Sequence, residues 1–158
     1  MKRNKWWTYG IFIALTLLVG MLSGFLSREG MEQVSKLPQS ALTPPSWVFP
    51  VVWGILYTLM GFGAARIWLS PESEERSRGL WLYLFQLVFN FFWTILFFRF
   101  SLYGLAFLWL LALIGLIVIM ICLFSKIVPT AAYLQLPYLL WCLFAAYLNF
   151  AVYMLNKN

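Results

Sequence analysis

The sequence contains no histidine and no aspartate. Its five acidic residues are glutamates that lie between the long apolar runs: Glu29, Glu32, Glu72, Glu74 and Glu75. Without histidine or paired acids inside these runs, catalytic triads and paired-carboxylate chemistry are excluded. A metal site would lack both imidazole and a carboxylate cage, so no metal is predicted. Proton-coupled pumps usually carry acids within the membrane, and that class is disfavoured too.

Charged residues are also scarce, at 10% of the chain against 63% hydrophobic residues. Soluble domains average roughly 25% charged residues, which they need to cover their surface. The two cysteines, Cys122 and Cys142, lie alone inside apolar runs and suggest small buried side chains rather than a redox pair. The surface of this protein is therefore expected to face lipid.

Apolar runs of the length that crosses a bilayer, roughly 20 residues, recur five times. They predict an all-α membrane protein with a bundle of five transmembrane helices in a single domain, residues 1–158. The expected helices span about 6–26, 47–69, 78–100, 102–124 and 129–155. The loop 27–45 contains Met31, Val34 and Leu37 at helical spacing. It is either a short amphipathic helix that lies over the bundle as a lid or an ordered loop.

The net charge of +6 does not indicate nucleic-acid binding, because the basic residues flank the apolar runs as membrane anchors do. Seven would lie on the side of the N-terminus: Lys2, Arg3, Lys5, Arg66, Arg76, Arg78 and Lys126. Four would lie on the opposite side: Arg28, Lys36, Arg99 and Lys157. This bias favours a multi-pass protein of the cell membrane with a cytoplasmic N-terminus and an external C-terminus.

Polar side chains within the third apolar run share one helix face. Gln86 and Asn90 are four residues apart, and Trp93 lies one turn further on. Amides in a lipid-embedded helix must point inward, because unpaired polar groups are costly there. They either hydrogen-bond to other helices or contact a ligand.

Two further runs combine aromatic, polar and small residues. In the second run Trp53 and Tyr57 share a face, and in the fifth a stripe contains Tyr138, Cys142, Ala145 and Asn149, with Trp141 beside it. Such a set suits a flat, mostly apolar ligand that is held by stacking and a few hydrogen bonds. The predicted ligand-binding residues are Trp53, Tyr57, Gln86, Asn90, Trp93, Tyr138, Trp141, Ala145 and Asn149. Arg28, Lys36 and Arg99 could meet ligand carboxylates.

Three segments carry a family resemblance. One is the run Leu42-Thr43-Pro44-Pro45-Ser46-Trp47-Val48-Phe49-Pro50-Val51-Val52-Trp53. The second is Gln86-x-x-x-Asn90-x-x-Trp93, and the third is Pro137-Tyr138-x-x-Trp141-x-x-x-Ala145-x-x-Leu148-Asn149. In order and spacing they resemble the tryptophan-rich sensory protein family, TspO, also called translocator protein or peripheral benzodiazepine receptor.

The resemblance implies a five-helix bundle, often dimeric, that binds porphyrins, some sterols and benzodiazepine-type drugs. It also implies that Trp53, Asn90 and Trp141 line the pocket. Some members degrade protoporphyrin in light, which would make Trp53 and Trp141 catalytic residues. No obligatory cofactor is implied, since porphyrin would be the ligand.

Three functions remain open from the sequence. The leading hypothesis is a membrane receptor or sensor that binds tetrapyrroles. One alternative is a light-dependent porphyrin-degrading enzyme with redox-active tryptophans, and another is a small carrier of lipophiles. Gly20-x-x-x-Gly24 offers a close-packing surface for a homodimer or for contacts within the bundle.

Overall fold

The computed structural model describes residues 4–157, in which every regular element is a helix. The elements are α1 (Lys5–Ser35), α2 (Val48–Trp68), α3 (Glu74–Thr94), the π-helical turn η1 (Ile95–Arg99), α4 (Tyr103–Ile127), α5 (Pro129–Tyr133) and α6 (Leu136–Leu155). Five segments are long and apolar enough to cross a membrane, with α3 joined to η1 and α5 to α6. This confirms the predicted all-α membrane fold.

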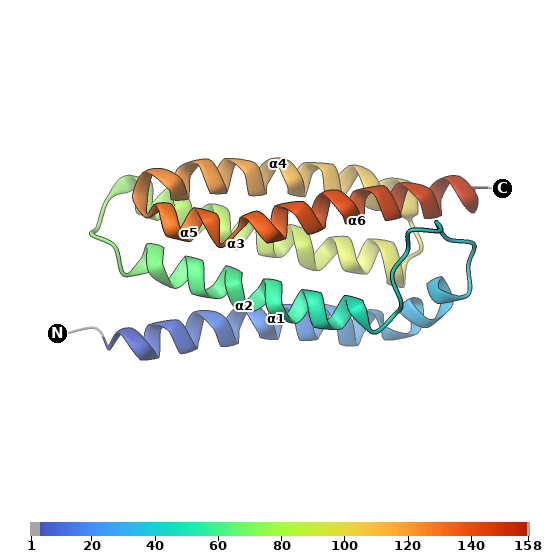
Figure 1. The fold of residues 1–158 in the computed structure, drawn as a ribbon, viewed down its shortest axis with the longest axis horizontal. Helices are drawn as coiled ribbons and strands as arrows, with labels where there is room; N and C mark the ends of the chain where they lie inside the picture. The colour runs from blue at the N-terminus through green and yellow to red at the C-terminus, as the bar shows by residue number, and fades with distance from the viewer. Residues whose placement is uncertain (1–3, 158) are drawn as a thin grey trace.

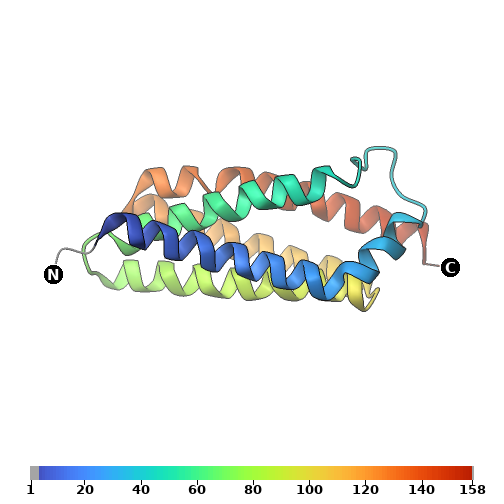
Figure 2. The same cartoon turned by 90° about the horizontal axis from the view of Figure 1, so that it is seen from below.

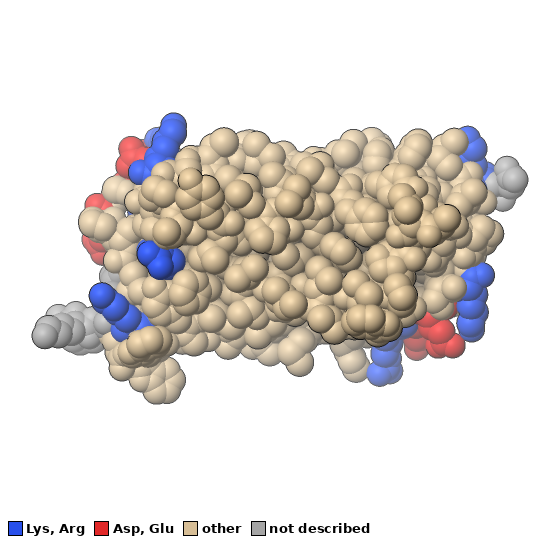
Figure 3. Space-filling view, in the orientation of Figure 1, with Lys and Arg blue, Asp and Glu red and all other residues tan. Residues whose placement is uncertain are grey.

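The helices run side by side along the length of the molecule (Figures 1 and 2). Around the bundle α1 neighbours α2, α2 neighbours α5 and α6, these pack on α4, α4 packs on α3, and α3 returns to α1. Lysine, arginine and glutamate gather at the two ends, and the surface between them is free of charge in this view (Figure 3). Lys2 and Arg3, which contributed to the expected charge bias, lie outside the described residues.

α4 supplies the centre of the core. Its inward stripe repeats every three or four residues and is almost fully buried: Leu110, Leu113, Ile117, Met120 and Phe124. Gly79 of α3 faces Phe124, and a Cβ at Gly79 would lie 3.3 Å from that ring. Since lipid is as apolar as leucine, helices in a membrane associate through such close contacts rather than through the hydrophobic effect.

α1 is longer than the sequence indicated, because it ends at Ser35 and not near Leu26. The charges from Arg28 onward mark where the chain leaves the apolar layer, but outside it water can solvate a helix and the helix continues. Gly30 lets α1 continue past its contact with η1, since a Cβ at residue 30 would overlap the carbonyl oxygen of Phe98. The expected short helix over 31–37 is therefore mostly the last turn of α1, and the loop is shortened to residues 36–47.

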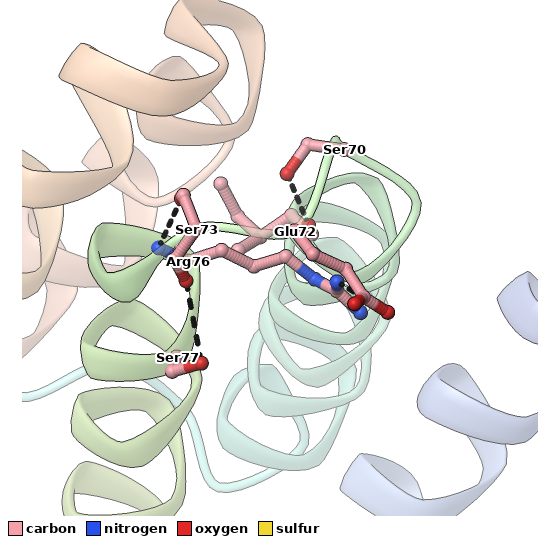
Figure 4. A network of polar contacts seen from close by, with 6 residues as sticks. Ser70, Glu72, Ser73, Arg76 and Ser77 are labelled. Carbon is pink, nitrogen blue, oxygen red and sulfur yellow. Dashed lines mark hydrogen bonds and ion pairs between the residues drawn. The ribbon is translucent and has the colours of Figure 1, made fainter.

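Three other boundaries differ from the expected ones. The third helix begins at Glu74 and not at Arg78, because the Ser73 side chain accepts a 3.0 Å hydrogen bond from the Arg76 amide (Figure 4). The fourth helix runs on to Ile127. The predicted helix 129–155 is divided between Tyr133 and Leu136. Pro137 lies in the first turn of α6, and proline disfavours continuation of a helix from the residues before it.

Candidate functional site

A chain of hydrogen bonds crosses the interior from α2 through α3 to α6. The Tyr57 hydroxyl donates to Asn90 Oδ1 at 2.7 Å, and Asn90 Nδ2 donates to the Tyr138 hydroxyl at 2.8 Å. Tyr138 in turn donates to Gln86 Oε1 at 2.8 Å. Gln86 Nε2 then approaches Met60 Sδ at 3.8 Å. We call Tyr57, Asn90, Tyr138 and Gln86 the amide–phenol chain.

The spacing of the two amides explains this chain. Gln86 and Asn90 lie one turn apart on α3, and both are fully buried where α2 and α6 meet that helix. Each amide finds a tyrosine on another helix, which offsets the cost of placing it in lipid. The structure thus shows the helix-to-helix hydrogen bonds that the sequence left as one of two possibilities. Ligand contact by these amides stays a prediction.

Trp93 and Asn149 form a second polar contact beside the chain. The Trp93 indole donates to Asn149 Oδ1 at 3.0 Å, and Asn149 Nδ2 donates to the Tyr103 carbonyl at 2.8 Å. Three helices, α3, α4 and α6, are joined by these two bonds. Both predicted residues are buried and have polar partners within the bundle.

Trp53 lies against the amide–phenol chain through its ring. Its centroid is 5.4 Å from that of Tyr57 in a stacked arrangement, 6.2 Å from Trp93 and 6.3 Å from Tyr138. These separations fall in the range of favourable aromatic pairs. Four of the predicted site residues therefore form one aromatic cluster.

Trp141 lies where α6 faces the start of α2. Its ring centroid is 5.9 Å from Phe49 and 5.5 Å from Phe144, and Ala145 is buried one turn away on the same helix. We call Phe49, Trp53 and Trp141 the α2–α6 seam. Phe49 was not among the predicted site residues, although its spacing of four from Trp53 places both on one face of α2.

The indole nitrogen of Trp141 is buried and has no hydrogen-bond partner among the described residues. A buried N–H without an acceptor loses the free energy of a hydrogen bond, and such groups are rare in folded proteins. Two other indole donors inside the bundle have acceptors, since Trp93 bonds to Asn149 and Trp109 to the Phe89 carbonyl at 2.8 Å. The seam thus contains a donor that an oxygen or nitrogen acceptor could use.

The basic residues expected near the ligand lie elsewhere. Arg99 donates to the Leu26 carbonyl at 3.2 Å, the Arg28 guanidinium lies 4.7 Å above the Phe25 ring, and Lys36 pairs with Glu32 at 3.3 Å. All three belong to α1, its C-cap and η1, whereas the seam belongs to α2 and α6. The structure does not bring them to Trp53 and Trp141.

The loop 36–47 passes over one end of the bundle, from α1 to α2 by way of α6 (Figures 1 and 2). The Ser40 and Tyr147 hydroxyls share a hydrogen bond of 2.6 Å, and Asn156 Nδ2 donates to the Pro38 carbonyl at 3.1 Å. The Tyr147 ring is stacked on Phe144, which contacts Trp141. The loop is therefore ordered, and it is linked to the seam through two side chains.

The chemistry available here is stacking, hydrogen bonding and electron transfer through indole or phenol rings. Within residues 4–157 no cluster of three or more metal-ligating histidine, cysteine or acidic side chains is present. The groups around the seam are aromatic, amide, aliphatic or, at Cys142, a buried thiol, and none is an ordinary general acid or base at neutral pH. Such a site fits the binding of a flat ligand better than hydrolysis or group transfer.

Known proteins resemble this chain over most of its length. A family profile described as TspO/MBR family matches residues 12–155. The "Translocator protein" of Sus scrofa is 37% identical over 148 residues, which cover 89% of this chain and 88% of the relative. The "Tryptophan-rich protein TspO" of Chlorobaculum tepidum is 34% identical over 159 residues, with 94% and 96% covered. The "Tryptophan-rich sensory protein" of Cereibacter sphaeroides is 34% identical over 115 residues, with 73% and 71% covered.

Proposed function

The chain belongs to the TspO/MBR family, and we propose that it is an integral membrane receptor or sensor that binds porphyrins and other flat lipophilic ligands at the α2–α6 seam. The indole N–H of Trp141, which has no hydrogen-bond partner in the part of the chain that the structure describes, carries this proposal. A ligand with an acceptor atom would supply the missing partner, and its flat faces would lie against Trp53 and Phe49. The amide–phenol chain beneath would keep the helices in place during binding.

A porphyrin suits the seam on chemical grounds. Its macrocycle is flat and apolar and stacks on indole and phenyl rings, and its nitrogens and carboxylates offer acceptors. Arg28, Lys36 and Arg99 each have a partner on α1, so we expect stacking to contribute more than ion pairs. Ligands of similar shape without carboxylates should therefore bind as well.

Light-dependent porphyrin degradation is the second candidate function. Its support is the cluster of Trp53, Tyr57, Trp93 and Tyr138, in which neighbouring rings could pass an electron to or from an excited porphyrin. Dioxygen would have to serve as the final oxidant. A third candidate, a lipophile carrier, is suggested by the name of the relative from Sus scrofa, which speaks of translocation by that protein.

A titration with protoporphyrin tests these alternatives. We expect Trp141→Phe to weaken binding in the dark about fivefold, because it removes one hydrogen-bond donor and keeps an aromatic face. Trp53→Phe should weaken it less. Trp81→Phe is the matched control, since Trp81 is an exposed residue of α3 far from the seam, and its affinity should equal that of the parent.

The same variants are then illuminated and the porphyrin absorption is followed with time. If the seam substitutions slow the loss of porphyrin far more than they weaken binding, the enzyme hypothesis gains support. If they change affinity alone, the receptor hypothesis stands. Affinity and photochemistry that match the parent in both seam variants would show that Trp53 and Trp141 only pack the core.

We propose that the N-terminus is cytoplasmic and that the loop 36–47 faces outward, following the bias of basic residues. Single cysteines at positions 35 and 75, in a background without Cys122 and Cys142, place one label at each end of the bundle. An impermeant thiol reagent on intact cells should label position 35 only. Labelling of position 75 alone would reverse the orientation.

A homodimer also stays a prediction. Gly20 packs against the Tyr57 ring of the same chain, whereas a Cβ at Gly24 would meet no other segment of residues 4–157 within 4 Å. The two glycines therefore do not form one outward surface, and a dimer through α1 would have to rely on Gly24 and the residues around it.

A further inference from the structure

A groove lies on the outer surface between α3 and α4, away from the α2–α6 seam. It is open on its outer side and has a volume of about 530 Å³. Cations, aromatic rings and aliphatic chains line it: Arg78, Trp81, Leu82, Phe85, Ile119, Cys122, Leu123 and Lys126.

Helix geometry explains why these residues meet. On α3, Arg78 is followed by Leu82 and Phe85 at steps of four and three, which keeps them on one face. On α4, Ile119 and Lys126 lie two turns apart on one face. α3 and α4 are consecutive antiparallel neighbours, so the cation of each helix lies at the same end of the groove. Below these cations the apolar stripe extends for roughly 10 Å, at 1.5 Å per residue.

The cationic end is available to an anion. Lys126 has no ion pair within the described part of the chain. Arg78 pairs with Glu74 at 2.8 Å, but both side chains are largely exposed and the two residues lie four positions apart on α3. Pairs of this kind are weak, so a phosphate could compete with Glu74 for the guanidinium.

The rest of the groove is apolar and open to lipid. Trp81 is 60% exposed, Phe85 53% and Ile119 55%, while Leu82 and Leu123 are half-buried beneath them. An inorganic anion would gain nothing from these side chains. An acyl chain would cover them, and an indole ring such as that of Trp81 is typical of the headgroup level of a bilayer.

We propose that the α3–α4 groove is a binding site for an anionic phospholipid, whose phosphate lies between Arg78 and Lys126 and whose acyl chain lies between the Trp81–Phe85 and Ile119–Leu123 walls. Basic pockets between transmembrane helices recognise anionic headgroups in this way. The proposal does not depend on the ligand of the α2–α6 seam. In the proposed orientation this end faces the cytoplasm, where anionic lipids are concentrated.

The expected selectivity follows from the two cations. A basic residue near a headgroup contributes roughly a fivefold preference for an anionic lipid, so the pair should enrich such a lipid about 25-fold over a neutral one. Loss of one cation should lower the enrichment to about fivefold. Glu74→Gln should raise it, because Arg78 would then have no competing carboxylate.

Fluorescence quenching by brominated lipids can measure this enrichment. The full chain is placed in phosphatidylcholine vesicles that contain a minor fraction of brominated phosphatidylglycerol. The quenching of Trp81 is the difference between the quenching of the parent and that of Trp81→Phe. This subtraction removes the signal of the other tryptophans. We expect that difference to exceed the value for the same fraction of brominated phosphatidylcholine.

Charge variants identify the source of the enrichment. Arg78→Gln with Lys126→Gln should reduce the Trp81 quenching to the level of the neutral brominated lipid. The matched control, Lys36→Gln with Lys157→Gln, removes the same charge at the other end and should leave the quenching unchanged. Arg78→Lys with Lys126→Arg retains both cations and should preserve the enrichment, which also guards against a folding defect in the glutamine variant.

Two results would overturn the proposal. One is equal quenching of Trp81 by the anionic and the neutral brominated lipid in the parent, which would make the groove an ordinary lipid-facing surface. The other is enrichment that survives in Arg78→Gln with Lys126→Gln but falls in the Lys36–Lys157 control, which would assign it to the other end of the bundle. Thermal unfolding in detergent shows whether each variant is folded before it is used.

Discussion

The amide–phenol chain and the α2–α6 seam are neighbouring regions that are held together in different ways. Three hydrogen bonds of 2.7–2.8 Å join the four residues of the chain, which are all buried. The residues of the seam contact other side chains through their rings, and the Trp141 N–H has no partner among the described residues. The amide–phenol chain can therefore fix the positions of the helices. The seam can rearrange around a ligand without breaking a hydrogen bond of its own.

Of the single substitutions, Asn90→Leu should lower the free energy of unfolding the most. It removes two hydrogen bonds and leaves the Tyr57 hydroxyl without its acceptor. We expect the free energy of unfolding to fall by about 2 kcal/mol. Tyr57→Phe, which removes one of the two bonds, should cost about half as much. Unfolding in mixed micelles measures both, and equal stability of Asn90→Leu and the parent would show that the chain does not hold the helices.

The same substitution beside the amide–phenol chain and in the seam sharpens the contrast. Trp93→Phe removes the bond to Asn149, whereas Trp141→Phe removes no hydrogen bond within the described chain. We expect Trp93→Phe to lower the free energy of unfolding by about 1 kcal/mol more than Trp141→Phe does. Part of any difference reflects the deeper burial of Trp93. A larger loss in Trp141→Phe would mean that the seam is the more firmly held region.

Two glycines of α1 test whether Tyr57 is fixed. A Cβ at Gly20 would overlap the Tyr57 ring, which is tied to Asn90 and has little freedom to move aside, while Gly24 has open space around it. Gly20→Ala should therefore lower the free energy of unfolding by about 1 kcal/mol. Gly24→Ala should raise it by about 0.5 kcal/mol, as alanine favours a helix over glycine.

Micelle unfolding of the two glycine variants reports the sign of each change. Opposite signs at Gly20 and Gly24 support a rigid Tyr57. If both substitutions stabilise the protein, the Tyr57 ring can move away from α1 and the amide–phenol chain is looser than its hydrogen bonds suggest.

The sequence predicted the membrane fold because lipid imposes a simple requirement on each crossing segment. It also placed Gln86 and Asn90 on one inward face, since their spacing of four is a property of α3 alone. It could not identify Tyr57, Tyr138 and Met60 as their partners. Those contacts depend on how α2 and α6 are rotated about their axes, and a single helix carries no information on that rotation.

The boundaries show a similar limit. Arg28 and Glu29 mark the edge of the apolar layer, but the end of α1 is decided further on, where Gly30 lets the helix pack against η1. The division between α5 and α6 could have been suspected from Pro137. A comparable omission in the site is Phe49, whose role at the seam depends on where α6 lies.

The smallest expected effect concerns the loop that leads to the seam. Ser40→Ala removes the hydrogen bond to Tyr147 and the 3.2 Å bond that the Leu42 amide donates to Ser40 Oγ. Both lie at the exposed end of the bundle, where water replaces a lost partner. The free energy of unfolding should therefore change by only about 0.5 kcal/mol. The rate of ligand release should rise more clearly, because the loop is then held to α6 mainly by Asn156 and Pro38.

Tyr147→Phe is the matched variant, since it removes the other partner of the same bond and keeps the ring on Phe144. The double variant should release porphyrin no faster than Ser40→Ala, because Tyr147→Phe removes a bond that Ser40→Ala has already removed. Tyr147→Phe keeps the bond from the Leu42 amide to Ser40 and can release porphyrin somewhat more slowly than Ser40→Ala. Stopped-flow displacement of protoporphyrin measures these rates. Additive increases would show that Ser40 and Tyr147 act through separate contacts, and unchanged rates would show that the ligand leaves the seam sideways between α2 and α6 without passing the loop.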